Sequence, residues 1–593
     1  MTAFEIEELR FTPESVEETR SRLPRFSNWP VVYLIEDGRD IYVGETGSAD
    51  RRMRQHLKSE QKRHLKEVRI VFDERFNGSA CLDLESLLIR LLGGDGKFQV
   101  MNRNEGITNQ DYFQRSEYND TFKEIFEELR SRGYFERSIP EIENSDLFKL
   151  SPYKALNTEQ GVAVLDIMEG LVEDLRHPEV RTIAAIQGDP GTGKTIVGIY
   201  LIKLMRDLAV FDPTDEVEGE SMFSDLFVEG NRDLFQGLRI GLVVPQKSLR
   251  KSISKVFRKV PALNSTQVLT PYDVADAQED FDVIVVDEAH RLTQRGAQAH
   301  GTLTKRYRET TERLFGKDDL AKNQLDWIRK RSCHTILLLD TAQSVRPIDI
   351  EPEVFDRVLA ETREQRRLYP LDTQMRVKGG KEYLDFARTL ISDNPPTTMP
   401  DLGDYEFELF DDLGAMHQRI RERDAEHGLA RLVAGYAWKW RSKNKSGLHD
   451  IELDGVALDW NVSDVDWIAS KTSIEEVGSI HTVQGYDLNY AGVIIGGDLR
   501  IDPETGQLVA DRTNYFDAKG KANNTMRGRT TTDEDLLRYI TNVYRVLLTR
   551  GMRGTYVYVV DSALRARIAD TLGSTPIKAE ATNAIILNPD SQN

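Results

Sequence analysis

The chain has 593 residues, of which 39% are hydrophobic and 30% are charged. At roughly 100–200 residues per domain this length corresponds to several domains, and the composition is that of folded proteins, which excludes wholesale disorder. The net charge of −19 disfavours binding of nucleic acid over the whole surface but allows a local basic groove. The cysteines are Cys81 and Cys333, too few for a disulfide scaffold or a Cys-based zinc cage.

Sequence features also indicate where the protein works. No apolar run approaches the roughly 18 residues of a membrane span. The amino terminus, MTAFEIEELRF, is acidic and lacks the apolar core of a signal peptide. We therefore expect a cytoplasmic protein with no membrane partner. The sequence leaves protein partners and homo-oligomers open.

The chain divides into a small first domain and two larger α/β units. The first domain begins with two apolar runs, residues 31–35 and 40–44, which flank the turn dipeptide Asp37-Gly38 and so indicate a hairpin. The boundaries that we expect are a lead-in with a short helix at 1–29, an α+β domain at 30–115, a connector at 116–155, α/β domains at 156–365 and 366–575, and a tail at 576–593.

Apolar strands alternate with amphipathic helices from residue 156 onward. This pattern is typical of buried parallel sheets and predicts an α/β fold class. In the first α/β unit the expected strands are 184–188, 240–245, 282–289 and 335–340. In the second they are 430–438, 477–482, 491–497 and 554–561.

A phosphate-binding loop is the strongest motif in the chain. It fits G-x-x-x-x-G-K-[ST] and lies between an apolar strand and a helical stretch, which is the context that the motif requires. The glycines let backbone N–H groups surround phosphate oxygens, while Lys194 reaches the β- and γ-phosphates and Thr195 binds Mg²⁺. The nucleotide-binding residues that we expect are Gly188, Asp189, Pro190, Gly191, Thr192, Gly193, Lys194 and Thr195.

A second motif supplies hydrolytic chemistry. In VIVVDEAH the apolar strand leads to Asp287, which is suited to hold Mg²⁺, and to Glu288, which is suited to polarise the attacking water. Hydrolysis also needs positive charge at the γ-phosphate in the transition state, and Arg376 and Arg550 are candidates for it. The cofactors that we expect are ATP and Mg²⁺.

The order of these segments resembles a superfamily 1 helicase or ATPase with two RecA-like P-loop domains. The segment LNTEQ is similar to the family's adenine-reading motif, in which Gln160 would contact the adenine. The segment LLLDTAQ is similar to the motif that senses the γ-phosphate, with Gln343 as the sensor. The segment around Gly485 resembles the one that links ATP to the bound strand, although Asp487 stands where many relatives carry a ribose-reading Glu. The arginine-finger motif is similar to LLTRG, with Arg550 as the finger. More narrowly, AGYAWKW and LLTRGMRG resemble the bacterial family related to the Schlafen helicase domain.

The first domain resembles the GIY-YIG nucleases over residues 30–105. The first hairpin strand carries Val-Val-Tyr where the family has Gly-Ile-Tyr. The second strand carries Tyr-Val-Gly. The resemblance implies cleavage of phosphodiesters with one divalent metal ion, Mg²⁺ or Mn²⁺. The candidate nuclease residues are Tyr33, Tyr42, Arg52, His56, Glu85 and Asn102.

Each of these nuclease candidates suits a step of the chemistry. Tyr33, with Tyr42, positions or deprotonates the attacking water, and Arg52 stabilises the pentavalent phosphate. Glu85 holds the metal ion. His56 shares a helix face with Arg52 because the two are four residues apart. We expect Tyr33, Arg52 and Glu85 to converge on one exposed face, flanked by Tyr42, His56 and Asn102.

Together these motifs favour the interpretation that the protein is an ATP-dependent nuclease. In this interpretation a metal-dependent endonuclease is tethered to a nucleic-acid-stimulated ATPase motor. DNA is favoured over RNA as the partner, and defence against foreign DNA such as phage follows by analogy. Two alternatives stay open. One is a helicase or repair factor whose first domain only binds branched or nicked DNA, and the other is a nucleotide-dependent switch. A small-molecule kinase fits the P-loop but leaves the downstream motifs unused.

Overall fold

The computed structural model divides the chain into two compact units, Met1–Thr341 with Ile348–Thr373 and Ala342–Pro347 with Gln374–Asn593. The structure describes residues 4–102, 115–154, 156–211, 222–296, 301–340, 346–374, 377–443, 447–462, 467–470, 472–483, 487–518, 520–573 and 576–577. Among these residues, every helix is too short or too polar to cross a membrane. Parallel sheets covered by helices dominate both units, which confirms the predicted α/β fold class.

The amino-terminal sheet has the strand order β1-β4-β2-β3-β5. The β1–β4, β4–β2 and β2–β3 pairs are antiparallel, whereas β3 and β5 are parallel. The elements of this domain are β1 (Phe4–Arg10), α1 (Pro13–Arg22), β2 (Val31–Glu36), β3 (Asp40–Thr46), α2 (Ala49–His56), β4 (Glu67–Asp73), α3 (Gly78–Asp95), β5 (Gln99–Val100), α4 (Arg115–Ser131), α5 (Ile139–Glu143) and α6 (Asp146–Lys149).

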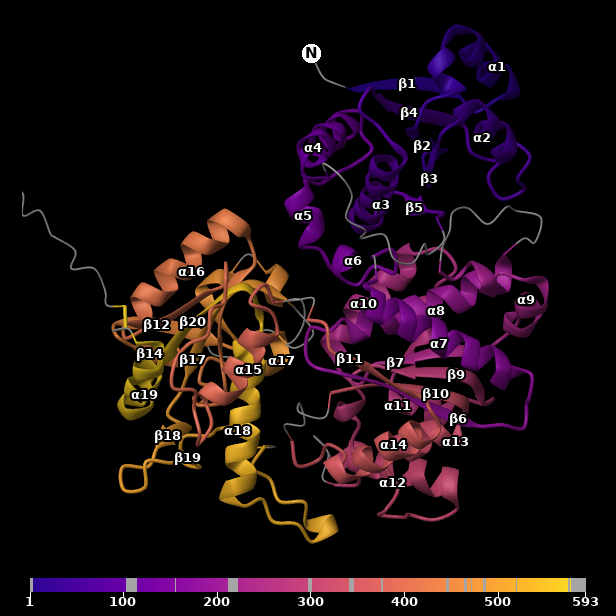
Figure 1. Cartoon of the computed structure of the whole chain (residues 1–593). Coiled ribbons are helices and arrows are strands. Elements are labelled where there is room, and N and C mark those ends of the chain that lie inside the picture. The colour runs from indigo at the N-terminus through magenta and orange to yellow at the C-terminus, as the bar shows by residue number, and fades with distance from the viewer. Residues whose placement is uncertain are drawn as a thin grey trace, which may run out of the picture. The chain divides into compact units, whose positions relative to one another are not determined.

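Helices cover both faces of the amino-terminal sheet (Figure 1). Tyr33 and Tyr42 point to the face that α1 and α2 cover, and Val32 and Val43 point to the face that α3 and α4 cover. This division arises because successive side chains of a strand point to opposite faces. The predicted hairpin is confirmed, since β2 and β3 pair directly along their length.

Both ends of this domain differ from the sequence expectation. Residues 1–29 are more than a lead-in, because β1 is an edge strand of the sheet, paired with β4 from Phe4 to Arg10. Residues 116–155 are more than a connector, because α4 and α5 complete the core beside α3 with buried Phe126 and Ile142. The amino-terminal domain therefore extends from β1 to α6.

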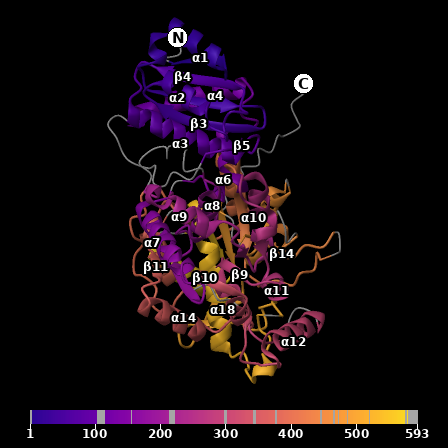
Figure 2. The same cartoon turned by 90° about the vertical axis from the view of Figure 1, so that its right-hand side faces the viewer.

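The P-loop sheet has the order β11-β6-β10-β9-β7-β8, and its described strand pairs are all parallel. α7 and α8 pack on one face, and α13 and α14 pack on the other (Figure 1). Figure 2 shows α8 and α14 on opposite sides of β10. Its elements are α7 (Thr158–Leu175), β6 (Thr182–Gly188), α8 (Lys194–Val210), α9 (Glu229–Phe235), β7 (Ile240–Val243), α10 (Lys247–Lys259), β8 (Val268–Leu269), α11 (Pro271–Asp276), β9 (Phe281–Val286), α12 (Gly301–Phe315), α13 (Gln324–Lys330), β10 (Ser332–Leu339), α14 (Pro352–Glu364) and β11 (Leu368–Leu371).

The four strands predicted for this sheet are confirmed as β6, β7, β9 and β10. β9 ends at Val286, so that Asp287 and Glu288 follow the strand instead of belonging to it. β11 pairs with β6 and extends the sheet to Leu371, past the domain boundary expected at residue 365. The strand was missed because LYPL is short and contains proline, which is unfavourable within a sheet.

Helix α10 packs into two hydrophobic cores at once. Leu249, Ile253 and Phe257 enter the core between the P-loop sheet and α8. Val256 and Val260 enter the core beside α3 of the amino-terminal domain. The two domains of this unit therefore share a helix.

The carboxy-terminal sheet has the order β12-β20-β17-β13-β16-β15-β14 and is parallel except for the β14–β15 pair. The strands predicted here are confirmed as β13, β16, β17 and β20. Its elements are α15 (Gly380–Leu390), β12 (Glu406–Phe410), α16 (Leu413–His427), β13 (Ala430–Ala434), β14 (Ile451–Leu453), β15 (Val456–Trp460), β16 (Glu476–Ser479), α17 (Ile480–Val483), β17 (Leu488–Ile495), β18 (Leu499–Ile501), β19 (Leu508–Ala510), α18 (Asp533–Leu548), β20 (Gly551–Val559) and α19 (Ser562–Leu572).

Candidate functional site

The phosphate-binding loop connects β6 to the amino end of α8. Gly191 and Gly193 have φ angles of 90° and 81°, which glycine adopts without strain. The Lys194 ammonium donates hydrogen bonds to the carbonyl oxygens of Gly188 and Asp189, at 2.6 and 2.8 Å. A phosphate oxygen is a stronger, charged acceptor for this ammonium than a carbonyl. Lys194 is therefore positioned at the loop and able to exchange these bonds for phosphate.

The two residues expected to bind Mg²⁺ are already in contact. Thr195 Oγ1 donates a hydrogen bond to Asp287 Oδ2 at 2.9 Å. Burial and the neighbouring charge of Glu288 raise the pKa of Asp287 to about 7. A divalent cation relieves this cost because its charge favours the ionised carboxylate. A hydroxyl and a buried carboxylate are oxygen ligands of the kind that Mg²⁺ prefers, so the pair fits this ion.

Glu288 occupies a strained backbone position next to Asp287. Its φ and ψ of 49° and 45° are left-handed, which costs a residue other than glycine about 1–2 kcal/mol. Burial opposes ionisation of Glu288, but the charges of His290, Arg291 and Lys194 outweigh it and hold its pKa below the usual range. Glu288 is therefore an ionised carboxylate near Lys194 of the phosphate loop.

His290 is the partner of Glu288 that sequence reasoning missed. Its Nε2 lies 2.9 Å from Glu288 Oε2, and the side chain is buried. His290 stands two positions after Glu288 in the segment VDEAH. Its contact with Glu288 could not be predicted, because a histidine in the loop after a strand follows no helical or strand periodicity. The contact places the imidazole against the carboxylate that we expect to polarise the attacking water.

Gln160 braces the phosphate loop. Its Nε2 donates to the carbonyl of Thr192 at 2.8 Å, and its Oε1 accepts from the backbone N–H of Asn157 at 3.1 Å. A Cβ at Gly193 would lie 2.4 Å from Gln160 Nε2, so the loop passes close over this amide. Both ends of the amide are engaged with backbone groups. The structure thus gives Gln160 a loop-positioning contact that the adenine-reading expectation did not include.

The remaining motor candidates are described only in part. Gln343, Arg376 and Gly485 lie outside the described residues. Arg550 follows α18, is 2% exposed, and donates from Nε to the carbonyl of Val546 at 3.2 Å. The roles of these four candidates stay predictions.

Tyr33, Tyr42 and His56 form one buried cluster on the α2 face of the amino-terminal sheet. Tyr33 lies opposite Gly44 in the hairpin, and a Cβ at Gly44 would stand 2.2 Å from the Tyr33 hydroxyl. The Tyr33 hydroxyl is 2.8 Å from His56 Nε2. The Tyr42 and His56 rings meet edge to face, with centroids 5.1 Å apart. Glycine therefore makes the space in which the tyrosine contacts the histidine.

Lys62 contacts the same cluster from the loop after α2. Its Nζ lies 3.3 Å from His56 Nδ1 and 3.7 Å from the centre of the Tyr42 ring. Burial lowers the pKa of His56 to about 2, and the charges of Lys62 and Arg52 act in the same direction. His56 is therefore neutral at physiological pH. Sequence reasoning did not assign Lys62 to the site, because its spacing from His56 in a loop follows no helical or strand period.

Glu85 approaches the site from the other face of the sheet. It is buried on α3, with 6% exposed, whereas Arg52 is half-buried on α2. Burial raises the pKa of Glu45 and the Arg52 charge lowers it in part. Burial also raises the pKa of the Cys81 thiol, and the carboxylates of Glu45 and Glu85 raise it further. The Arg52 charge thus acts on Glu45, and the Glu45 and Glu85 carboxylates both act on Cys81. Glu45, directly after the second triplet, was missed in the sequence.

Asn102 supports the edge of β3 around which these groups lie. β5 pairs with β3 only at Asp40 and Ile41. Beyond that point Asn102 Oδ1 accepts the Val43 N–H at 3.1 Å, and Asn102 Nδ2 donates to the Val43 carbonyl at 2.8 Å. The amide therefore takes the place of a neighbouring strand. In this structure Asn102 positions the strand that carries Tyr42 and Gly44.

The arrangement differs from the expected convergence on one exposed face. Tyr33, Tyr42 and His56 are 0%, 3% and 3% exposed, and Glu85 is carried by a helix on the opposite face of the sheet. Arg52 is half-buried on α2. The candidates therefore lie on both faces of the amino-terminal sheet instead of on one exposed face.

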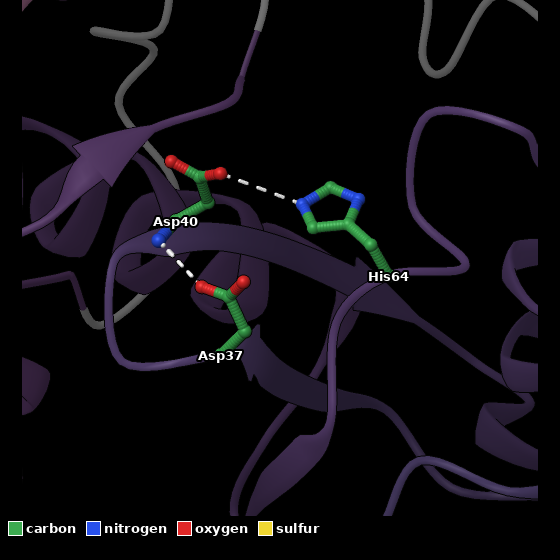
Figure 3. A group of neighbouring side chains, drawn as sticks. All are labelled: Asp37, Asp40 and His64. Carbon is green, nitrogen blue, oxygen red and sulfur yellow. Dashed lines mark hydrogen bonds and ion pairs between the residues drawn. The ribbon is translucent and has the colours of Figure 1, made fainter.

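A separate group of ligand-type side chains lies at the hairpin turn (Figure 3). Asp37, Asp40 and His64 offer atoms within 4.8 Å of one another. Asp37 Oδ1 accepts the backbone N–H groups of Arg39 and Asp40, at 3.0 and 2.8 Å. These bonds are those of an Asx-type turn, which accounts for the carboxylate without a metal ion.

Comparisons with known proteins bear on the P-loop and carboxy-terminal sheets. An uncharacterized protein of Saccharomyces cerevisiae, YPL245W, is 25% identical in an alignment 428 positions long that covers 67% of this chain and 85% of the yeast protein. The profile of the Schlafen group 3 DNA/RNA helicase domain matches residues 181–561. This region includes the phosphate loop, Asp287, Glu288 and Arg550, and it is a helicase-like domain of a nucleic-acid-associated ATPase. The match extends over more than half of the chain, and the chain therefore belongs to the Schlafen group 3 helicase family.

Proposed function

We propose that the protein is an ATP-dependent nuclease. A small GIY-YIG-like endonuclease domain is tethered to a motor of two RecA-like P-loop domains that hydrolyses ATP when nucleic acid binds. DNA is the favoured substrate. The cellular role, by analogy with other such pairings, is defence against foreign DNA such as phage.

The motor half rests on the Thr195–Asp287 contact. The hydroxyl and carboxylate would hold Mg²⁺, which would supply positive charge beside the phosphates when bound. Lys194 neutralises the β- and γ-phosphates, and Glu288 accepts a hydrogen bond from the attacking water. Arg550 is the candidate arginine finger and Gln343 the candidate γ-phosphate sensor. Arg376 supplies a further positive charge.

The nuclease half rests on one observation, the Tyr33 hydroxyl held at 2.8 Å from His56 in space left by Gly44. A buried phenol requires a hydrogen-bond partner, and here that partner is an imidazole, which can donate to or accept from the hydroxyl. Arg52, half exposed beside this cluster, suits the phosphate of a substrate. Glu85 would hold one Mg²⁺ or Mn²⁺ ion, which supplies charge at the phosphate and the leaving oxygen.

Cleavage and ATP hydrolysis can be separated with two isosteric variants. The parent, Glu85→Gln and Glu288→Gln are incubated with labelled single-stranded, duplex, forked and RNA substrates, with Mg²⁺ or Mn²⁺, with and without ATP. We expect the parent to cut DNA, Glu85→Gln to lose cleavage and keep ATPase activity, and Glu288→Gln to bind ATP without turnover. Absence of cleavage by the parent on every substrate and metal would contradict the nuclease proposal but leave the ATPase proposal intact.

A second candidate is a helicase or repair ATPase whose first domain binds branched or nicked DNA without cutting it. The burial of Tyr33, which has no exposed surface, favours this alternative because a general base must reach water and phosphate. The same substrate panel decides between the two. Binding of forked DNA that is unchanged in Glu85→Gln, with no metal-dependent product, supports the binding domain.

A further inference from the structure

His56 has a polar partner at each ring nitrogen. Nε2 is 2.8 Å from the Tyr33 hydroxyl, and Nδ1 is 3.3 Å from Lys62 Nζ. The ring is buried, and its neighbours in the cluster are the Tyr33 and Tyr42 rings. The two nitrogens are therefore distinguished by chemically different partners.

The chemistry of the lysine decides the tautomer. An ammonium group has three N–H donors and no acceptor, so Nδ1 must accept from Lys62. A neutral imidazole carries its single proton on the other nitrogen, which is Nε2. The imidazolium form is disfavoured because its Nδ1–H would point at the Lys62 charge, with Arg52 nearby on the same helix. The Nε2–H then donates to the Tyr33 oxygen.

The Lys62 ammonium is itself held in place. It lies over the face of the Tyr42 ring, 3.7 Å from the ring centre, where the electrons of the ring attract a cation. The side chain is half-buried, which limits the water that competes for its protons. The Tyr42 ring thus orients the lysine, and the lysine orients the histidine.

We infer that Lys62 is a positioning residue for cleavage: it fixes His56 in the Nε2–H tautomer, so that His56 donates to Tyr33 and stabilises its phenolate. This inference rests on the proposed nuclease function. Among the described residues, the charged or titratable groups that contact or act on His56 include Tyr33 from β2, Tyr42 from β3, Arg52 from α2 and Lys62 from the following loop. On this assignment His56 does not act as the base that deprotonates Tyr33, because its Nε2 already carries a proton.

The proton balance follows from that assignment. Tyr33 has no exposed surface in this structure, so its hydroxyl must first reach solvent, to which it then loses its proton. As the oxygen of water bonds to phosphorus, one of its O–H bonds breaks and the proton goes to the Tyr33 oxygen. The bond from phosphorus to the leaving oxygen breaks, and that oxygen departs with the bonding pair and takes a proton from solvent. Tyr33 returns its proton to solvent before the next cycle.

The tautomer is measured first, in the full chain, because it does not depend on cleavage. The nitrogen shifts of ¹⁵N-histidine-labelled protein identify which nitrogen of His56 is protonated, with His56→Gln supplying the assignment. We expect Nε2–H in the parent, a mixture of tautomers in Lys62→Met, and recovery of Nε2–H in Lys62→Arg, since a guanidinium also only donates. Nδ1–H in the parent, or an unchanged tautomer in Lys62→Met, overturns the inference.

Cleavage is then measured against pH. Lys62→Met should lose at least about tenfold in rate near neutral pH and recover as pH rises, because Tyr33 then deprotonates without the stabilising hydrogen bond. Lys62→Arg should restore the parental profile, and Lys123→Met, an exposed lysine on α4, should leave it unchanged. If the cleavage rate of Lys62→Met depends on pH in the same way as that of the parent, the inference that Lys62 assists cleavage is overturned. A parent that shows the expected tautomer but no cleavage refutes the proposed nuclease and supports the tautomer assignment.

Discussion

Gly44 gives the Tyr33 hydroxyl its place, because a Cβ at residue 44 would stand 2.2 Å from that oxygen. Gly44→Ala should therefore push the phenol out of its contact with His56 and abolish cleavage. Overpacking of this kind costs about 1–3 kcal/mol of stability. Gly47→Ala is the matched control, since nothing lies within 4 Å of its Cβ position. Cleavage assays and thermal unfolding of both variants test the pair, and equal cleavage by the two would contradict the assignment of Tyr33.

Lys194→Ala should reduce ATP hydrolysis by orders of magnitude, because a cation at the transferring phosphate commonly supplies several kcal/mol to the transition state. Lys305→Ala, an exposed lysine on α12, serves as the control. Steady-state phosphate release with and without nucleic acid measures both. A parental rate in Lys194→Ala would show that the loop does not bind the phosphates as proposed.

Glu288→Gln should keep nucleotide affinity and lose turnover, since the amide cannot accept a proton from the attacking water. His290→Ala, which removes the contact at 2.9 Å from Glu288, should lower turnover less severely because the carboxylate remains. Binding of a fluorescent ATP analogue and phosphate release are measured together. If Glu288→Gln hydrolyses ATP at the parental rate, another residue polarises the water.

Arg550→Ala should lower turnover far more than ATP affinity, because an arginine finger acts mainly on the charge of the transition state. The side chain is buried in this structure, so the substitution also removes packing. Arg550→Lys separates the two effects, since it preserves bulk and charge but not the planar fork. If ATP affinity and ATP turnover fall by the same factor in both variants, Arg550 contributes to binding of ATP in the ground state instead.

The neutral His56 predicts a pH dependence of stability. Folding lowers its pKa from 6.5 to about 2, so the unfolded chain binds the extra proton between these values. The stability contributed by neutral His56 is present above pH 6.5 and falls as pH drops below it, by up to about 1.4 kcal/mol per pH unit. Hydrogen exchange of β2 and β3 amides near pH 7 and pH 5 should show this loss, and His56→Gln should reduce it. An identical pH response in His56→Gln would mean that other groups cause it.

Buried strands were predictable from the sequence because a parallel strand covered on both faces is a continuous apolar run, as in β9 and β17. β1 was not, because FEIEELR alternates charge with few apolar residues and pairs on one edge only. The phosphate loop and its Asp287 partner were also predictable, since both follow strands at fixed spacing. The left-handed backbone conformation of Glu288 was not predictable, because it depends on the packing of the neighbouring residues.

The amino-terminal site shows where sequence patterns stop being informative. Tyr33 and Tyr42 could be named from the hairpin, and the side on which each lies follows from strand alternation. Glu45 and Lys62 could not, because their relation to the site depends on how a strand edge and a loop fold back. Asn102 was named for flanking the site, but its two bonds to Val43 emerge only where β5 ends.

The helix shared by two cores restricts how this protein can be taken apart. A fragment ending at α6 would lose Val256 and Val260 and leave an apolar gap beside α3. In a fragment that begins at α7, the side chains of those two valines would be exposed to water as an apolar patch. A chimera that exchanges the first domain for an unrelated one would meet the same mismatch, because the new domain would lack a surface that fits Val256 and Val260.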